Sequence, residues 1–153
     1  MGTGEAREQR TENRDQGPPI LSAAKVPTFR DLIVWQRARE LSLAIYELTR
    51  QFPRDELYGL SSQLRRAAVS IMSNIAEGHG RGSVPQLMHF LLIARGSTFE
   101  VQSQLILASD LGLADTGAIS RCECLCDEVG RMLFATLSTL RSKQRETATK
   151  TIL

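Results

Sequence analysis

The chain has 153 residues, of which 42% are hydrophobic, so its size and composition suit one domain with a single apolar core. Its net charge of +2 is too small to identify a nucleic-acid-binding protein by itself. The sequence has no run of about 18 apolar residues, and its charged N-terminus has no apolar signal region. We therefore expect a cytoplasmic protein with neither a membrane span nor a secretory signal.

The N-terminal segment, residues 1–27, is predicted to be a disordered tail. It mixes Gly, Pro, Glu, Arg and Gln with almost no periodic apolar residues, so it buries too little surface to offset the entropy of ordering. Its basic and acidic residues balance, which argues against a basic nucleic-acid-binding arm at this end of the chain.

Residues 28–143 are predicted to form four helices. The first begins near Thr28, whose spacing to Asp31 is that of a helix-start signal, and it is ended by Pro53. Its apolar residues recur at steps of three and four: Trp35, Ala38, Leu41, Ile45 and Leu48. The second helix has the stripe Leu57, Leu60, Leu64, Ala67, Ile71 and Ile75. Gly78 is expected to form its left-handed C-terminal cap.

The third helix is predicted to open with a capping box at Ser83 and Gln86 and to reach Gly112. It is expected to be the longest of the four, at about 40 Å. Asp115 or Thr116 then caps the fourth helix. The stripe of the fourth helix is Ile119, Cys122, Cys126, Val129, Leu133, Thr136 or Leu137, and Leu140. Residues 144–153 are expected to form a flexible C-terminal tail. Short connections between long helices predict an all-α, antiparallel up-and-down four-helix bundle.

A second apolar seam accompanies the core stripe of the third helix, which consists of Leu87, Leu91, Ala94, Thr98, Val101 and Leu105. The second seam consists of Met88, Leu92, Phe99 and Ile106. At 100° per residue, this seam lies about 100° around the helix from the core stripe. Two interpretations remain open: the helix is flanked on two sides within its own bundle, or the seam is an interface between subunits of an oligomer.

Several phrases in fixed order resemble the family called the four-helix bundle protein, also known as the protein encoded by intervening sequences in bacterial large-subunit ribosomal RNA genes. The phrases are FRDLIVWQ from Phe29, FPxxE from Phe52, GLxxQLRRAA from Gly59, SNIAEGxGR from Ser73 and FLxIAxGSxxE from Phe90. The resemblance implies a homopentamer of antiparallel four-helix bundles. More distant relatives, the accessory proteins of diversity-generating retroelements, bind nucleic acid and a reverse transcriptase.

Two adjacent arginines, Arg65 and Arg66, lie on the second helix, and their side chains must diverge by about 100°. At least one of them therefore faces solvent. Together with Arg81 in the next loop, they are the candidate contacts for nucleic-acid phosphates. The simpler interpretation, that they are solvated charges or partners in ion pairs, carries more weight on sequence alone.

The polar end of the second helix is interpreted as structural. Asn74 and Glu77 are three residues apart on one face, and with Gly78 they are expected to form a polar cluster that bonds backbone groups or a neighbouring chain. The loop that follows is rich in glycine, but it lacks the preceding strand and the lysine of a nucleotide-binding loop. We therefore expect an ordinary turn there.

Metal and catalytic sites are not expected. Neither His79 nor His89 has a glutamate three residues before it, as a di-metal carboxylate bundle requires. Cys122 and Cys126 share one helix face while Cys124 points away, so the first two are predicted to be reduced core cysteines rather than metal ligands. No set of nucleophile, base and orienting group is recognisable. The sequence thus predicts no cofactor, no metal and no enzymatic activity.

The predicted function is that of a non-enzymatic, homo-oligomeric scaffold or adaptor. Its expected ligand is nucleic acid, either RNA or DNA, or a nucleic-acid-processing protein that docks on a basic surface. The alternative is an enzyme or a metal-dependent redox protein built within the bundle. That alternative rests only on three cysteines, two histidines and a few carboxylates.

Overall fold

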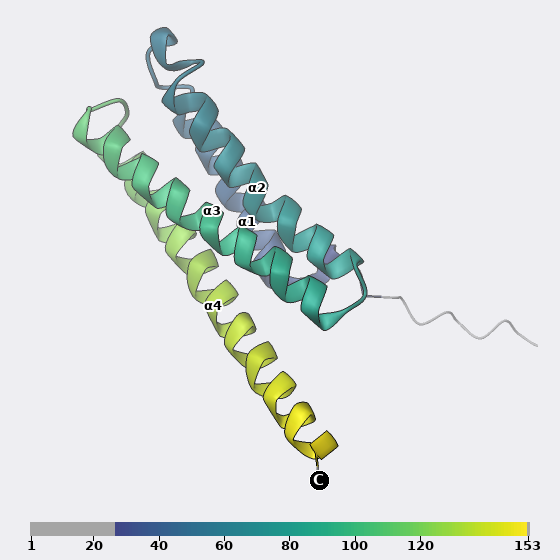
Figure 1. Ribbon diagram of the computed structural model, residues 1–153. Coiled ribbons are helices and arrows are strands. Elements are labelled where there is room, and N and C mark those ends of the chain that lie inside the picture. The colour runs from purple at the N-terminus through teal and green to yellow at the C-terminus, as the bar shows by residue number, and fades with distance from the viewer. Residues whose placement is uncertain (1–26, 153) are drawn as a thin grey trace, which may run out of the picture.

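The computed structural model describes residues 27–152, so the prediction for the N-terminal tail lies outside the described residues. The described elements are the 3-10 turn η1 (Phe29–Asp31), α1 (Ile33–Leu48), the 3-10 turn η2 (Arg54–Glu56), α2 (Leu60–Gly80), α3 (Val84–Asp110) and α4 (Thr116–Ile152). This part of the chain contains no strand. The fold is all-α, as predicted (Figure 1).

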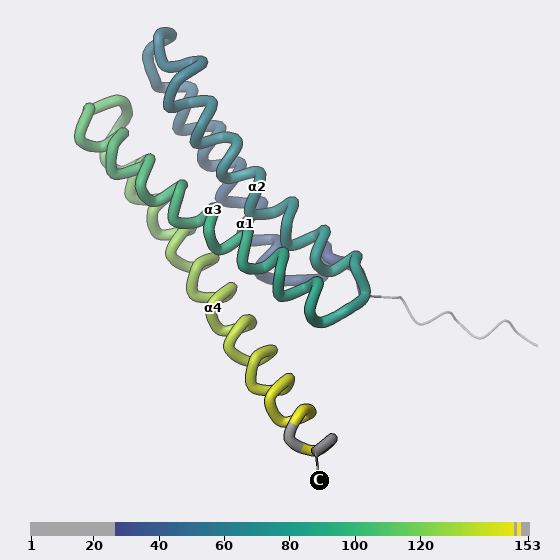
Figure 2. Tube along the Cα trace, in the orientation of Figure 1, coloured from purple at the N-terminus to yellow at the C-terminus, as the bar shows by residue number. Residues whose placement is uncertain are grey.

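The four helices enclose one core. Helix α1 packs against α2 and α4, and α3 packs against the same two helices, whereas the described helices on each diagonal do not approach one another closely. The order around the bundle is therefore α1, α2, α3, α4. The trace in Figure 2 shows the short turn from α2 to α3 at one end of the bundle and the turn from α3 to α4 at the other. The face over α1 and α2 consequently lies opposite the face over α3 and α4.

The start of the first helix differs from the prediction. The capping box of Thr28 and Asp31 does form, with the Thr28 backbone N–H donating to Asp31 Oδ2 at 2.8 Å. It caps the η1 turn, however, and α1 begins only at Ile33. A capping box fixes the start of a helical turn but not how far the turn continues, because continuation depends on the residues beyond it.

Two predicted features of the α2–α3 connection are wrong. Gly78 is not a left-handed cap: α2 continues to Gly80, and the positive φ of 72° falls at Gly82. Gly78 is instead buried where α2 meets α3, and a Cβ added there would lie 2.9 Å from the Cβ of Phe90. The Ser83 side chain makes no capping hydrogen bond, although its carbonyl accepts from the Leu87 N–H.

The α3–α4 connection agrees with the prediction at both of its ends. Gly112 adopts φ of 62°, and the N–H groups of Gly112 and Leu113 donate to carbonyls in the last turn of α3, which is the Schellman arrangement. Asp115 caps the next helix, because its Oδ2 accepts from the Ala118 N–H at 3.0 Å. Left-handed backbone at position 112 favours glycine, since other side chains are strained there.

Helix α4 is the longest, with 37 residues against 27 for α3, and this corrects the expectation for α3. It passes the predicted boundary at residue 143 and continues to Ile152. Residues 131–152 contain neither Gly nor Pro, so nothing in this segment interrupts the helical hydrogen bonds. Within residues 27–152, no helix combines the length and the apolar character that a bilayer crossing requires.

The predicted core stripes are confirmed except at Leu57, which precedes α2 and is 48% exposed. The largest fully buried side chains include Leu41, Ile45, Leu48, Leu64, Ile71, Ile75, Leu105, Leu133 and Leu137. All three cysteines are free thiols, with Cys122 and Cys126 buried and Cys124 exposed. Between α2 and α3, the hydroxyls of Ser70 and Ser97 hydrogen-bond at 2.9 Å, so each satisfies the other where the two helices meet.

The buried thiols are expected to be protected from reagents until the protein unfolds. Burial raises the pKa of Cys122 to about 11 and that of Cys126 to about 12, so their reactive thiolate forms are scarce at neutral pH. Titration with a thiol reagent should detect Cys124 rapidly in the native protein and the other two only in denaturant. Rapid reaction of three thiols in the native protein would contradict their burial.

The same pKa values predict alkaline sensitivity. The thiols are neutral in the folded protein, so their contribution to stability is fully present below the unfolded-state pKa of about 8.5. This contribution is lost as the pH rises from the unfolded-state pKa to the folded-state pKa values of about 11 and 12. Over this range the two thiols lose their protons in the unfolded chain but keep them in the folded protein. The free energy of unfolding should fall by about 1.4 kcal/mol per pH unit for each thiol. Cys→Ala variants measured over the same pH range provide the control.

Candidate functional site

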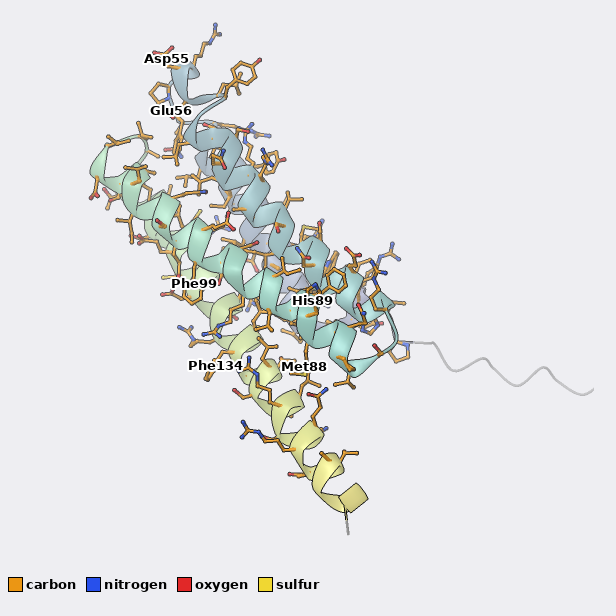
Figure 3. The ribbon with its side chains drawn as sticks, in the orientation of Figure 1. Asp55, Glu56, Met88, His89, Phe99 and Phe134 are labelled. Atoms are coloured by element: carbon orange, nitrogen blue, oxygen red, sulfur yellow. The ribbon has the colours of Figure 1, made fainter. Side chains whose placement is uncertain are left out.

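The second seam of α3 is exposed in the single chain. Leu92, Phe99 and Ile106 are 41%, 56% and 57% exposed, and Met88 is partly buried against the core. The bundle's own helices therefore leave most of the seam uncovered. The side chains in Figure 3 show Phe99 near the middle of α3 and Met88 closer to its first turns.

Helix α4 adds to this surface a phenylalanine that the sequence pattern does not indicate as a site residue. Phe134 is 55% exposed, and the Arg95 guanidinium lies 5.3 Å from its ring centroid and 5.6 Å from that of Phe99. Figure 3 shows both phenylalanines on the α3–α4 side of the bundle. Gln102 and Asp127 join the two helices beside them by a hydrogen bond of 2.6 Å. We call Leu92, Arg95, Phe99, Ile106 and Phe134 the aromatic face.

A second exposed surface lies over α1 and α2. It borders an open groove of about 570 Å³ and includes Tyr58, which is 92% exposed. We call its residues the tyrosine face: Tyr46, Leu57, Tyr58, Arg65, Arg66 and Val69. Of these residues, the sequence indicates only the two arginines as site residues, because Tyr46 and Val69 lie beside the core stripes and do not interrupt their spacing. Leu57, predicted to lie in the core, is 48% exposed.

The two adjacent arginines have different surroundings. Arg65 Nε donates to Thr49 Oγ1 at 2.8 Å, and its guanidinium lies 4.9 Å from the Tyr46 ring centroid, so this side chain is held against α1. Arg66 is exposed. The prediction that the pair diverges, with at least one side chain in solvent, is confirmed.

Arg81 lies at the opposite end of α2 from this pair. Fifteen residues of helix separate it from Arg66, which corresponds to about 22 Å. Arg81 forms an ion pair with Glu77, and its guanidinium lies 5.1 Å from the Phe90 ring centroid. Within one subunit, the structure does not bring the three candidate arginines together.

The three residues predicted as a polar cluster make separate contacts. Asn74 donates to the Ser70 carbonyl and hydroxyl at 2.8 and 3.1 Å. Glu77 pairs with Arg81, and Gly78 packs against α3. Their roles are structural contacts within the chain, but they do not form one network.

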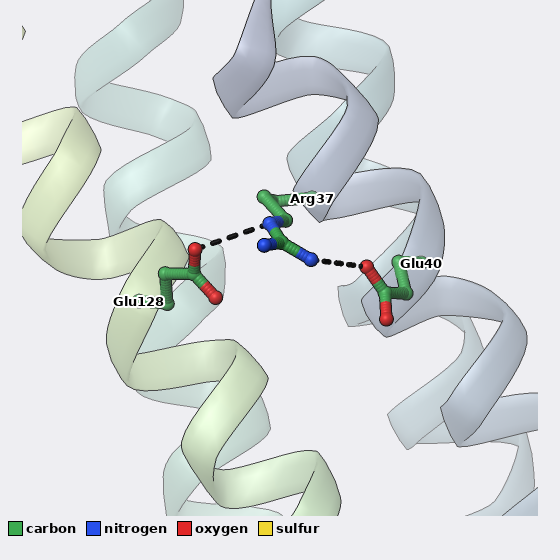
Figure 4. Close-up of polar contacts among 3 residues, drawn as sticks. All are labelled: Arg37, Glu40 and Glu128. Atoms are coloured by element: carbon green, nitrogen blue, oxygen red, sulfur yellow. Dashed lines mark hydrogen bonds and ion pairs between the residues drawn. The ribbon is translucent and has the colours of Figure 1, made fainter.

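A further arginine joins α1 to α4. Arg37 binds Glu40 at 2.8 Å and Glu128 at 3.1 Å, as Figure 4 shows. The hydrogen bond to Glu40 and the charge of Glu128 raise the pKa of Arg37 above its usual value. Exposed pairs of this kind contribute little to stability, but they occupy the guanidinium. Arg37 is therefore a bundle contact rather than part of a free basic surface.

The described residues offer no metal site: residues 27–152 contain no group of three or more His, Cys, Asp and Glu side chains placed to hold an ion. Their charge is unevenly distributed. Residues 27–128 hold ten basic and twelve acidic residues, whereas residues 129–153 hold five basic and one acidic. The positive excess of the whole chain thus resides in the second half of α4.

The sequence model of the 23S rRNA-intervening sequence protein family matches residues 30–135. A similar fold occurs in the crystal structure of a protein with unknown function from the S23 ribosomal protein family of Bacteroides thetaiotaomicron VPI-5482. That match has a TM-score of 0.62 at 19% identity and covers 69% of this chain and 98% of the other. At this identity, the likeness concerns the fold alone. No curated protein matches the sequence.

Proposed function

This chain belongs to the 23S rRNA-intervening sequence protein family, and we propose that it is the subunit of a non-enzymatic, homo-oligomeric scaffold that binds nucleic acid. The proposed oligomer is a ring of five antiparallel, up-and-down four-helix bundles. The number five is the one that the family resemblance implies, and the position of the two exposed faces supports a ring.

The observation that carries this proposal is the pair of exposed apolar faces on opposite sides of the bundle. The aromatic face lies over α3 and α4, and the tyrosine face lies over α1 and α2. Two different faces that bind each other make a head-to-tail contact, and such contacts generate closed rings when the rotation between subunits permits. A two-fold dimer would cover only one face and leave the other in water. Exposed apolar surface of this kind commonly marks an interaction site.

Both faces combine aromatic rings with arginines, which suits them to each other. Arg95 already lies beside two phenylalanines, and Arg65 lies over Tyr46. Aromatic residues and arginine are enriched in protein interfaces, because they bury large areas and retain polar contacts. Arg66 also borders a neighbouring hollow with Glu100, so it occupies the rim of the tyrosine face nearest α3. Rim arginines remain accessible to phosphates after subunits join.

The nucleic-acid part of the proposal rests on exposed arginines that the ring repeats. Repetition raises avidity through effective concentration, and contacts with phosphates are electrostatic. Glutamine at positions 65, 66 and 81 should therefore weaken binding of a labelled RNA and reduce its salt dependence. In a plot of the logarithm of the affinity against the logarithm of the salt concentration, the slope should become shallower. The expected change is about 0.7–0.9 for each phosphate that is no longer neutralised.

The matched control replaces three exposed arginines outside the two faces: Arg39, Arg50 and Arg54. Arg66→Gln alone should account for most of the effect, because Arg65 and Arg81 have partners within the chain. Equal RNA binding by the triple variant and the wild type would remove these arginines from the site. Stoichiometric iron or zinc in untagged protein would contradict the non-enzymatic part of the proposal.

A further inference from the structure

The C-terminal part of α4 extends past the bundle. Figure 1 shows α4 running beyond the turn between α2 and α3 to a separate end. Every described side chain from Arg141 to Lys150 is exposed, so this segment adds nothing to the core. It also lies beyond residues 30–135, which the family model matches. The shared fold therefore does not account for this segment, and its role depends on the residues of this chain.

The extension is the basic part of an otherwise slightly acidic molecule. No acidic residue occurs between Glu128 and Glu146. The basic residues of this half of α4 are Arg131, Arg141, Lys143, Arg145 and Lys150. A net charge of +2 for the whole chain therefore conceals a local excess of four positive charges in residues 129–153, the second half of α4. Such local excess, rather than the average, determines where a polyanion binds.

Part of this charge follows one side of the helix. Arg131, Phe134, Ser138, Arg141 and Arg145 recur at steps of three and four, and all five are exposed. They form a stripe about 21 Å long at 1.5 Å per residue. The stripe begins at the aromatic face through Phe134 and continues along the extension. Lys143 and Lys150 lie on other sides of the same helix and widen the positive surface.

We propose that residues 138–150 form a basic helical arm that binds the phosphate backbone of nucleic acid. This inference rests on the proposed function, because it names the part of the scaffold that holds the ligand. Arginine and lysine supply the charge, and the interleaved Ser138 and Gln144 supply a hydroxyl and an amide of the kind that commonly accompany phosphate contacts.

The composition of the arm distinguishes nucleic acid from other acidic partners. Among the described side chains of 138–150, only Leu140, which packs against the core, and Ala148 are apolar. A helix that lies on a membrane needs a broad apolar face, which this segment lacks. Protein interfaces usually have an apolar centre, whereas nucleic-acid interfaces are polar and strongly positive. The observations therefore favour phosphates over a lipid surface or an acidic protein.

The test uses the full chain and a short fluorescein-labelled single-stranded RNA, titrated at about 50 to 200 mM salt, where phosphate contacts change affinity most visibly. The arm variant carries glutamine at positions 141, 143, 145 and 150. A matched control removes four exposed arginines elsewhere: Arg39, Arg50, Arg54 and Arg121. The arm variant should lose about tenfold or more in affinity at low salt, with a salt slope lower by about 0.7 for each phosphate that the arm no longer neutralises. The control should stay within about twofold of the wild-type affinity.

Basic residues near a helix C-terminus also stabilise the helix through its dipole, so helicity must be measured in parallel. Arg141→Lys with Arg145→Lys keeps the charge and should bind nearly as well as the wild type. Unchanged RNA binding by the glutamine variant would show that the arm does not bind RNA. If only the variant at Arg65, Arg66 and Arg81 loses RNA binding, the arm is not the binding site, but the scaffold still binds nucleic acid as proposed. If the wild type binds no RNA at low salt, both fail. Preferential binding to phosphatidylserine vesicles would show that the arm binds a membrane surface rather than nucleic acid.

Discussion

Aspartate at both Phe99 and Phe134 is expected to convert the wild-type oligomer into folded monomers. Each ring is more than half exposed in the single chain, so a charge at either position does little harm to the bundle itself. In the ring, the same positions would be covered by a neighbouring subunit. The variant would then forfeit about 1.5–3 kcal/mol for each phenylalanine and would bury two carboxylates beside the single guanidinium of Arg95.

Light scattering at micromolar concentration measures the mass, and circular dichroism confirms that the helices persist. Ala135→Asp is the matched control, since Ala135 is exposed, is adjacent to Phe134, and points about 100° away from it around α4. The control should retain the wild-type mass. A monomeric wild type, or an unchanged mass for the double variant, would show that the aromatic face is not an interface.

Leucine at Gly78 is expected to have the largest effect on stability. A Cβ at this position would lie 2.9 Å from Phe90 Cβ and 3.3 Å from the Leu87 carbonyl oxygen. These atoms belong to the framework of α3, so the two helices would have to separate to admit a side chain. Overpacking of this kind typically costs about 1–3 kcal/mol, and leucine should reach the upper end. At about 2–4 °C per kcal/mol for a chain of this size, the Tm should fall by roughly 6–12 °C.

Gly96→Ala is the matched control for this substitution. Gly96 also lies within a helix, but it is exposed and a Cβ there would meet no atom within 4 Å. Alanine should stabilise α3 by about 0.5–1 kcal/mol, because it lowers the entropy lost on folding. Both variants must be compared at one protein concentration, since association shifts the apparent Tm. A wild-type Tm for the leucine variant would contradict the close approach of α2 and α3.

The repeat of apolar residues predicted the core, because a helix that buries one face needs apolar residues at steps of three and four in its sequence. The stripe from Ile119 to Leu137 is confirmed throughout, and Leu137 rather than Thr136 occupies the ambiguous position. The spacing of Cys122 and Cys126 likewise predicted two buried thiols and an exposed Cys124. These predictions required only the period of the helix.

The errors arose where the outcome depends on a neighbouring helix. Gly78 resembles a helix cap in sequence, but its actual role is to admit Phe90, which comes from the next helix. Ser83 and Gln86 have the spacing of a capping box, yet spacing does not determine the side-chain rotamer that makes the bond. The distance between Arg66 and Arg81 is likewise a property of the uninterrupted helix that contains both.

The extension of α4 was missed for a different reason. Residues 144–152 have no apolar stripe, and we therefore expected a flexible tail. A helix that continues from a folded segment needs no new nucleation, however, so polar residues without Gly or Pro can remain helical. The local charge was overlooked because the net charge averages the slightly acidic bundle with the basic arm.

The protruding end of α4 would give a closed ring a direction. Rotation about a ring axis places every copy of a given segment at the same height, so all the arms would emerge at one level of the particle. One pole would then be strongly positive, while the remainder of each subunit, with twelve acidic against ten basic residues, would be weakly negative. The Debye length, over which the opposite poles of two particles attract each other, is about 30 Å at 0.01 M salt and about 8 Å at physiological ionic strength. Such particles would tend to stack end to end in dilute buffer and to separate as salt is added.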